Sequence, residues 1–402
     1  MVVSEMENFN EIWTHLIRAI TNNRNCLQHI SGFLIQIFPA LCLQNVSKDP
    51  KINREVLSKR LEMWKNGNFN ELLIDAKTAQ SNIKKKKPCC KINKVVCEKN
   101  KFLSAIKNGD IRKAAQSIDE NNLGVMSCTD SVVTTLKDKF PSSDKVITIK
   151  DHKGADFTSS KIVPSTIFRA IMASPSKAGG INHLGYHTVK NLIRLEKSGK
   201  SLIHELTNVT NCLANKRVHN LSDFLATRTL PIQKSDGTPR PVGIGDVVRR
   251  ICLKVINQQY RDKIILACHL QFGNGLSGGN EALIHALHEV SQNMDSNNNV
   301  ILKLDAKNAF NLIDRQNALN SVYKRVPCLY LACLNTYGEP SYTVIGNNKI
   351  PVESGTNQGC PLAGSFFNLG LCTLIEEVST NSNASHGWYY DDGNAFGKKK
   401  MS

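Results

Sequence analysis

Two acidic sites that lie far apart in the sequence are the residues best suited to chemistry. Asp305 follows the apolar run 300–304, and the pair Asp391-Asp392 follows the aromatic run 388–390. Adjacent carboxylates repel one another, so a paired acidic turn is better explained by a bound cation than by folding alone. Carboxylates on neighbouring strand ends can hold two Mg²⁺ ions, about 3.5–4 Å apart, which stabilise the attacking and leaving oxygens of a phosphoryl transfer.

We therefore predict that Asp305, Asp391 and Asp392 bind two Mg²⁺ ions, or Mn²⁺ in their place, and act as catalytic residues. Asp391 is the better ligand candidate of the pair. Asp392 can instead contact a primer end or a group that supports the metal ligands. Two ordinary interpretations stay open. A single Asp after a strand often caps a helix, and Asp-Gly is a favoured turn pair.

Three residues between the acidic sites are suited to holding a nucleotide. The ring of Phe310 can pack against the sugar of an incoming nucleotide and exclude a 2′-hydroxyl, although most phenylalanines are simply core residues. Gln358 can hydrogen-bond template or nucleotide, and Gly359 lets the backbone lie close to a base pair. In this order along the chain, the acidic and nucleotide signals together favour a nucleic-acid polymerase.

Basic residues further upstream in the sequence are suited to binding phosphate groups. Lys234 and Arg240 flank a predicted turn at residues 236–237, from which they can reach a triphosphate, while surface salt bridges are the alternative. Three more lie on a predicted helix, 247–259, and suit contacts to a template backbone: Arg249, Arg250 and Lys254.

Helices and strands with distinct periods must position these residues. Apolar residues that recur every three or four positions predict helices over residues 8–21, 54–64, 70–80, 101–118, 131–139, 186–194, 201–214, 247–259 and 362–378. Strands are predicted over 229–232 and 241–244, over 342–345 and 350–352 with a turn at Asn347-Asn348, and over the run 300–304, which is expected to be buried.

Two local signals add detail to this pattern. Pro239 and Pro241 lack amide donors, so the first hairpin is expected at a sheet edge or as a projecting finger. Asp246 is expected to cap the helix 247–259.

Composition limits the class of protein. The chain has 402 residues, 41% of them hydrophobic, and a formal net charge of +17, as expected of a folded protein that binds phosphate backbones. The apolar stretch 32–43 is too short to span a bilayer, so no membrane attachment is expected. Thirteen cysteines without any Cys-x-x-Cys indicate free thiols in a reducing compartment rather than a zinc site.

We predict an α+β fold in three parts: a helical N-terminal region over 1–160, a fingers-like part over 161–300 and a palm over 301–402. A basic segment, 84–101, interrupts the first part. It is a solvated linker or, on the sharper interpretation, a nuclear-import or RNA-contacting patch.

From about residue 175 to residue 397 the chain resembles the reverse transcriptase domain of non-LTR (LINE-type) retrotransposons. The resemblance is carried, in order, by Leu230-Pro-Ile-Gln-Lys-Ser-Asp-Gly-Thr-Pro-Arg-Pro-Val242, Val247-Val-Arg-Arg250, Leu304-Asp-Ala-Lys-Asn-Ala-Phe-Asn311, Gln358-Gly-Cys-Pro-Leu362 and Tyr389-Tyr-Asp-Asp392. It implies a right-hand polymerase with fingers and palm. Its implied site has metal ligands at Asp305, Asp391 and Asp392, a sugar gate at Phe310, and nucleotide contacts from Gln358, Arg240 and Lys234.

The reaction that the resemblance implies is RNA-directed DNA synthesis, by attack of a primer 3′-hydroxyl on the α-phosphate of a dNTP. The implied partners are an RNA template, dNTPs and a DNA primer, typically nicked target DNA; protein partners are not indicated. The implied location is inside the cell, in the nucleus with a cytoplasmic ribonucleoprotein stage.

The chain stops at Ser402, shortly after Asp392. The lysine-bearing strand, primer grip and thumb that such domains have beyond the acidic hairpin are absent from it, so we expect a truncated element copy or a partial gene product with impaired activity. Alternatives are a group II intron-type maturase and a catalytically inactive RNA-binding remnant. Phe310 argues against an RNA-dependent RNA polymerase, because that enzyme must accept the 2′-hydroxyl.

Overall fold

The computed structural model describes residues 3–22, 28–47, 49–85, 124–157, 161–175, 178–273, 275–294, 299–381 and 384–398. The chain divides into two compact units. The small unit contains Leu41–Leu136 and Leu230–Pro241, and the large unit contains Val2–Ala40, Lys137–Thr229 and Val242–Ser402. In this division the first helix belongs to the large unit, and the predicted boundaries at residues 160 and 300 stay predictions.

The small unit contains three described helices, α3 (Pro50–Lys65), α4 (Phe69–Lys85) and α7 (Asp130–Lys137). Pro50 opens α3 behind Asp49, whose side chain accepts a hydrogen bond from the Lys51 amide and so caps the helix. Arg60 is fully buried between α3 and α4, where it donates to Asp75 at 2.7 Å. The predicted helices 54–64, 70–80 and 131–139 are confirmed, whereas 101–118 and most of the basic segment lie outside the described residues.

The large unit begins with α1 (Val3–Ala19), and α2 (Gln28–Cys42) follows. α1 packs against α10 (Gly199–Asn215), with Phe9 and Trp13 fully buried. The Glu7 carboxylate accepts hydrogen bonds from the backbone amides of Lys197 and Ser198, which precede α10. These contacts explain why the first helix folds with the second half of the chain.

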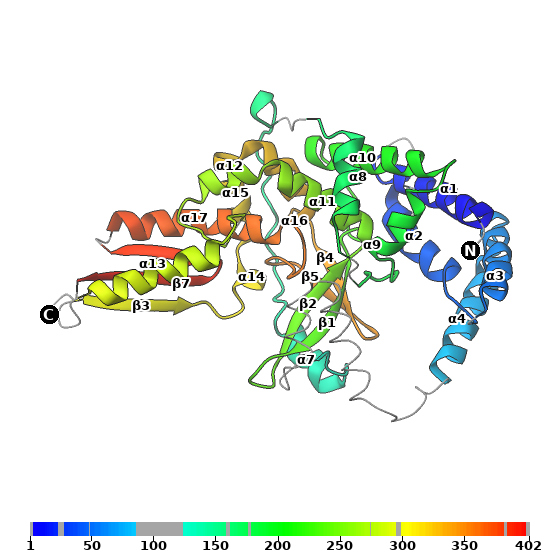
Figure 1. Cartoon of the computed structure of the whole chain (residues 1–402), viewed down its shortest axis with the longest axis horizontal. Coiled ribbons are helices and arrows are strands. Elements are labelled where there is room, and N and C mark those ends of the chain that lie inside the picture. Colours follow the sequence, from blue (N-terminus) through cyan, green and yellow to red (C-terminus); the bar gives the residue numbers. More distant parts are fainter. Residues whose placement is uncertain are drawn as a thin grey trace. The chain divides into compact units, whose positions relative to one another are not determined.

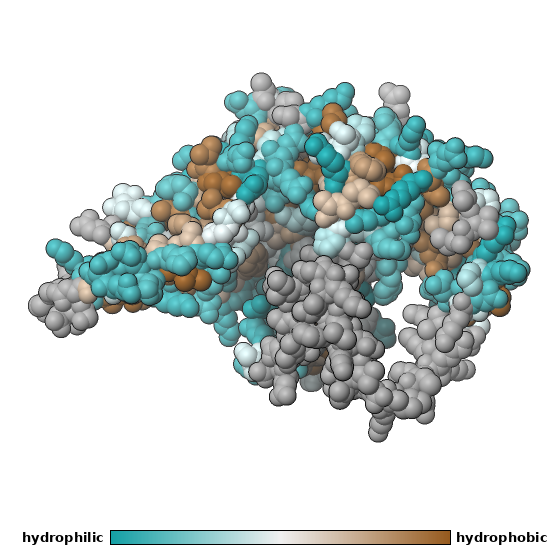
Figure 2. Space-filling model, viewed as in Figure 1, coloured by the Kyte–Doolittle hydropathy of each residue, from teal (hydrophilic) through white to brown (hydrophobic). Residues whose placement is uncertain are grey.

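The other helices of the large unit are α8 (Pro164–Met172), α9 (Tyr186–Leu192), α11 (Val247–Gln259), α12 (Arg261–Ala267), α13 (Gly279–Asn293), α14 (Ala309–Leu312), α15 (Arg315–Arg325), α16 (Tyr330–Tyr337) and α17 (Ala363–Asn381), with short 3-10 helices η1 (Ala155–Phe157) and η2 (Pro327–Leu329). Asp246 caps α11 as predicted, because its side chain accepts from the Val248 amide at 2.7 Å. In Figure 2 hydrophilic residues make up most of the coloured surface, and hydrophobic residues form smaller groups on it. Among the described residues, no helix has the length and apolar character that crossing a bilayer requires.

Within the described residues, seven strands form two sheets. The first has the order β2-β1-β4-β5, built from β1 (Thr227–Gln233), β2 (Pro239–Gly245), β4 (Ser341–Ile345) and β5 (Asn348–Val352). Both predicted hairpins are confirmed, and β2, the strand with the prolines, is an edge strand. The second turn lies one residue earlier than predicted: Ile345 pairs with Asn348, so Gly346 and Asn347 form the turn.

The second sheet has the order β3-β7-β6, built from β3 (Asn299–Asp305), β6 (Ser385–Tyr389) and β7 (Asp392–Lys398). Figure 1 shows α17 and α13 running along this sheet. The Ser379 hydroxyl of α17 contacts the His386 ring at 2.7 Å, and Leu283 of α13 lies against Gly387. The mixed helix and sheet content agrees with the α+β prediction.

The expectation that the strand before Asp305 is buried is wrong. β3 is an edge strand, and four of its apolar side chains are between 42% and 52% exposed: Val300, Ile301, Leu302 and Leu304. A run of apolar residues does not distinguish a central strand from an edge strand, because it carries no information about how many strands lie beside it.

Candidate active site at the acidic hairpin

The two acidic sites meet at one end of the three-stranded sheet. β3 and β7 pair antiparallel from Asn299 opposite Lys398 to Asp305 opposite Asp392. Directly opposed residues of such a pair have Cα atoms roughly 4.5–5.5 Å apart and side chains on the same face. Residues distant in the sequence therefore carry adjacent carboxylates, as the sequence predicted.

Asp391 lies in the two-residue turn, Tyr390-Asp391, that joins β6 to β7, since Tyr389 pairs with Asp392. Tyr390 has φ +56°, a left-handed conformation that a bulky residue rarely adopts. Such a conformation costs about 1–3 kcal/mol and persists where surrounding contacts fix it. The turn that carries the acidic pair is therefore held by tertiary structure.

The Tyr390 ring occupies a niche with little spare room. A Cβ atom at Gly273 would lie 2.8 Å from this ring, and one at Gly364 would lie 2.9 Å from it. The Phe310 ring is 5.7 Å from the Tyr390 ring and stacks on Phe367 at 4.4 Å with an interplanar angle of 13°. Phe310 is half-buried, so it packs as a core residue on one side and remains accessible beside the acidic turn.

The loop with Gln358 docks onto the same region. The Thr356 amide donates to the Phe310 carbonyl at 2.6 Å, and a Cβ at Gly355 would lie 2.2 Å from the Asn311 backbone. Arg315, which is 6% exposed, donates to the Gly355 carbonyl at 2.9 Å. Burial lowers the pKa of Arg315 to about 10.

These bonds place the backbone of the Gln358 loop beside Phe310. Arg315 donates to four backbone carbonyls in all, one of them at the end of β5: Gly355, Glu339, Val352 and Ser354. The Gln358 side chain itself is half-buried.

Gly359 has a structural reason to be glycine. Its φ is +106°, and a Cβ there would lie 2.1 Å from the Gly243 carbonyl oxygen of β2. The Gly243 amide in turn donates to the Gln358 carbonyl at 2.8 Å. The close backbone approach predicted for Gly359 is therefore made to β2, and its contact with a base pair stays a prediction.

The prediction that Arg249 and Arg250 contact template does not fit the structure. Arg249 is 2% exposed and donates to the Leu225 carbonyl, and Arg250 is 8% exposed and lies over the Tyr186 ring at 5.1 Å. Side chains already bound inside the large unit cannot reach a nucleic-acid backbone. Lys254 is half-buried and donates to the Ser174 hydroxyl at 2.8 Å, so its template contact stays a prediction.

Lys234 and Arg240 flank the hairpin turn as predicted. The Lys234 amide donates to the Thr238 carbonyl at 2.9 Å, and the Asp236 carboxylate accepts from the Thr238 hydroxyl at 2.6 Å. Arg240 is exposed and Lys234 is half-buried. This turn belongs to the small unit, and its contact with a triphosphate stays a prediction.

The acidic hairpin fits a divalent cation that is also bound by substrate. Asp305 is exposed, Asp391 and Asp392 are half-exposed, and carboxylate oxygens are the ligands that Mg²⁺ prefers. Within the described residues no group of three His, Cys, Asp or Glu side chains is arranged to hold a metal. Mg²⁺ is usually bound by one or two carboxylates together with substrate phosphates and water, so two opposed carboxylates are sufficient protein ligands.

The sequence analysis assigned no role to three residues that hydrogen-bond within this site or shape its turn: Gln271, Arg315 and Tyr390. Gln271 is a buried polar residue between the apolar neighbours Leu270 and Phe272. A polar residue inside an apolar run was the available signal for Gln271. Arg315, directly after the capping Asp314 of α15, gave no comparable signal, because basic residues at helix starts are usually exposed.

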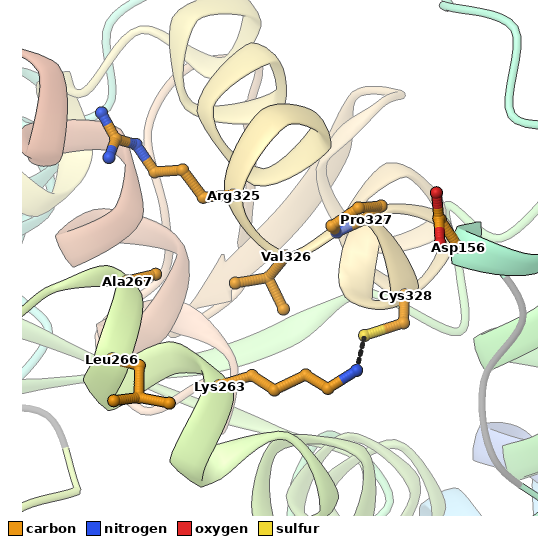
Figure 3. Close-up of a pocket in the computed structure, with 8 residues that line it drawn as sticks. All are labelled: Asp156, Lys263, Leu266, Ala267, Arg325, Val326, Pro327 and Cys328. Atoms are coloured by element: carbon orange, nitrogen blue, oxygen red, sulfur yellow. Dashed lines mark hydrogen bonds between the residues drawn. The ribbon is translucent and has the colours of Figure 1, made fainter.

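A separate cavity of about 520 Å³ lies among α12, the end of α15, η1 and η2 (Figure 3). In it the Lys263 ammonium group lies 3.7 Å from the Cys328 sulfur. Arg325 also lines the cavity, but its guanidinium group binds the Glu376 carboxylate through two 2.5 Å hydrogen bonds. No predicted site residue lines this cavity, so it is not part of the candidate site.

A strand-end carboxylate opposite an acidic hairpin, with an aromatic ring and a glutamine loop beside it, is suited to metal-assisted nucleotidyl transfer. Residues 232–402 match the family model described as reverse transcriptase (RNA-dependent DNA polymerase). This part of the chain therefore carries a reverse transcriptase domain, which implies a polymerase fingers and palm fold and substrates of template, primer and dNTP. The match begins at residue 232, so the resemblance seen from residue 175 is supported from there onward.

Proposed function

We propose that this protein is the reverse transcriptase of a non-LTR retrotransposon, which extends a DNA primer on an RNA template. The primer 3′-hydroxyl attacks the α-phosphate of a dNTP, a new phosphodiester bond forms, and pyrophosphate leaves. The observation that carries the proposal is the pairing of Asp305 with Asp392 at the end of β3 and β7, within the matched residues 232–402.

Asp305 and Asp391 are the proposed metal ligands, and Asp392 binds the same cations or the primer end. When bound, Mg²⁺ or Mn²⁺ supplies charge neutralisation at the α-phosphate and lowers the pKa of the attacking hydroxyl. Asp305 is exposed, so its carboxylate is accessible to a ligand, and Asp391 lies in the turn that precedes Asp392.

Phe310 and Gln358 are the proposed nucleotide contacts. Phe310 is fixed from behind by Phe367, so its free edge can stand against the sugar and exclude a 2′-hydroxyl. Gln358 lies in the loop that docks on Phe310 through Thr356. Lys234 and Arg240 are proposed to bind the triphosphate, since an exposed guanidinium and a lysine at one turn match phosphate oxygens. For Gly359 we propose that its backbone contacts the base pair.

The test is single-nucleotide addition to a DNA primer annealed to an RNA template, with Mg²⁺ and, separately, with Mn²⁺. We expect dNTP incorporation by the wild-type chain and none by Asp305→Asn or Asp391→Asn. Filter binding of the template-primer should be unchanged in both variants, because neither substitution removes a basic residue. Incorporation that survives Asp305→Asn would contradict the proposal.

A second candidate is an RNA-binding protein that retains the polymerase fold without its chemistry. The net charge of +17 favours it, since basic residues bind phosphate backbones in any sequence. Its signature is salt-dependent RNA binding by wild type and Asp305→Asn alike, with no nucleotide added under any metal condition. A group II intron-type maturase would instead bind one structured RNA far more tightly than unrelated RNA of equal length.

We further propose that the protein lies inside the cell, in a cytoplasmic ribonucleoprotein and then in the nucleus, where the primer would be target DNA. Immunofluorescence of the tagged full chain tests this location. Exclusion from the nucleus at all times would contradict it.

A further inference from the structure

A single buried side chain binds both backbone polar groups of Tyr390. Gln271 is 2% exposed and lies between α12 and α13. Its Nε2 donates to the Tyr390 carbonyl at 2.9 Å, and its Oε1 accepts from the Tyr390 amide at 3.0 Å. A primary amide carries its donor and its acceptor on separate atoms of one planar group, which suits these two hydrogen bonds.

The segment with Gln271 is itself fixed to the acidic hairpin. The Trp388 amide donates to the Leu270 carbonyl at 2.9 Å, and the Phe272 amide donates to the Trp388 carbonyl at 2.7 Å. Gln271 and Trp388 thus form a parallel bridge on the side of β6 away from β7. The bridge sets the register of Gln271 against the turn, so its amide group meets the backbone of Tyr390.

The turn needs such support for two reasons. Tyr390 takes φ +56° without being glycine, a conformation that surrounding contacts must impose. The next two residues are Asp391 and Asp392, and Asp392 is opposite Asp305, where like charges repel. Without a contact that fixes the backbone of Tyr390, the turn can relax in ways that separate the carboxylates.

We propose that Gln271 is a positioning residue for the acidic pair, an inference that rests on the proposed function. By fixing the peptide groups on both sides of Tyr390, Gln271 orients Asp391 and Asp392 toward a shared divalent cation. Gln271 touches neither substrate nor reacting atoms, and it acts only through the turn.

Three substitutions separate the parts of this contact. Gln271→Met keeps the length of the side chain and loses both hydrogen bonds. Gln271→Glu keeps an acceptor for the Tyr390 amide but sets a carboxylate against the Tyr390 carbonyl. Gln271→Asn keeps the amide chemistry with a shorter reach. The matched control is Gln292→Met, a substitution of an exposed glutamine on α13.

The experiment measures Mn²⁺ binding to the full chain by electron paramagnetic resonance of the free ion, alongside single-nucleotide addition over a range of Mn²⁺ concentrations. Loss of a group that orients a metal ligand typically weakens metal affinity about 10–100-fold. We expect a loss in that range for Gln271→Met and no change for Gln292→Met. In the addition assay, the Mn²⁺ requirement should rise while excess Mn²⁺ restores much of the rate.

A merely structural role would lower the unfolding temperature without changing the Mn²⁺ affinity of the folded protein. That result, or affinity within about twofold of wild type for every folded Gln271 variant, well short of the usual loss, would overturn the proposal. Should Gln271→Met fail to fold, Gln271→Asn and Gln271→Glu provide the same comparison. Hydrogen exchange adds a local readout: exchange in a peptide over residues 386–396 should quicken, and one over α15 should not.

The Asp305→Asn variant separates this inference from the proposed function. If wild type and Asp305→Asn bind Mn²⁺ equally, the acidic site itself is absent, and both proposals fail. If Asp305→Asn loses Mn²⁺ binding and the Gln271 variants keep it, only the positioning role fails.

Discussion

Two hairpins of the large unit have two-residue turns, and in both the first turn residue has a positive φ. The two turns stabilise this conformation in different ways. Between β4 and β5, Gly346 takes φ +60° before Asn347. Between β6 and β7, Tyr390 takes φ +56° before Asp391. Glycine reaches this conformation freely, so the first turn follows from its own sequence. The second turn is held by Gln271 and by a niche for its ring, which shows where tertiary contacts maintain a conformation that local sequence disfavours.

The largest expected effect is on the rate of nucleotide addition, which should depend on the acidic hairpin and not on the hairpin between β4 and β5. Asp305→Asn removes the carboxylate opposite Asp392 and should lower nucleotide addition about a thousandfold or more, equivalent to several kcal/mol of transition-state stabilisation. Asn347→Ala, in the ordinary turn, should leave the rate unchanged. Single-turnover addition rates measure both. Equal rates for wild type and Asp305→Asn would remove the distinction between the hairpins.

A smaller effect concerns the ring beside the acidic turn. Phe310→Val shortens the side chain that faces the proposed sugar position while Phe367 remains beneath it. We expect the preference for dNTP over rNTP to fall about 10- to 100-fold, the range that hydrophobic contacts can discriminate. The measurement is the ratio of incorporation efficiencies, in which any loss of folded protein cancels. An unchanged ratio would show that Phe310 is only a core residue.

Substitutions of the first residue in each turn compare how much the turns contribute to the free energy of unfolding. Tyr390→Gly relieves the backbone but empties the niche between Gly273 and Gly364, so the free energy of unfolding should fall by about 2 kcal/mol. Gly346→Ala adds backbone strain without a cavity and should cost about 1 kcal/mol. Urea denaturation measures both. A more stable Tyr390→Gly protein would mean that the ring packing does not support the turn.

The smallest expected effect is a response of stability to cations. Without divalent ions, Asp305 and Asp392 repel, so Asp305→Asn should unfold at a slightly higher temperature than wild type. Millimolar Mg²⁺ should raise the unfolding temperature of wild type by roughly 1–4 °C and leave Asp305→Asn unchanged. Differential scanning calorimetry with and without Mg²⁺ gives the comparison. A matching rise in both proteins would indicate cation binding elsewhere.

Local chemistry determined which parts of the fold the sequence could predict. The Pro239 and Pro241 edge strand, the Asp246 cap and both hairpins of the first sheet follow from the conformations of single residues, and the structure confirms them. The convergence of Asp305 and Asp392 was also predicted, because Asp305 follows an apolar run and Asp391-Asp392 follow an aromatic run, each suited to a strand that ends at a turn.

Features that depend on neighbours could not be predicted. The burial of Arg249 and Arg250 depends on the Leu225 carbonyl and the Tyr186 ring, which lie outside their own helix. The exposure of β3 depends on how many strands stand beside it. The roles of Gln271 and Arg315 depend on hydrogen bonds to distant backbone groups, which no periodicity encodes.

β3 lies at the edge of its sheet, so the backbone N–H and C=O groups along its outer side form no hydrogen bonds to another described strand. In the described part of the chain it pairs with β7 alone, and Leu302 and Leu304 are about half exposed beside that outer side. Strands of this kind recruit other extended segments, and the charge of Lys303 is the main local deterrent. Handling the protein in concentrated solution therefore carries a risk of intermolecular β-pairing, and the strand that bears Asp305 is where it would start.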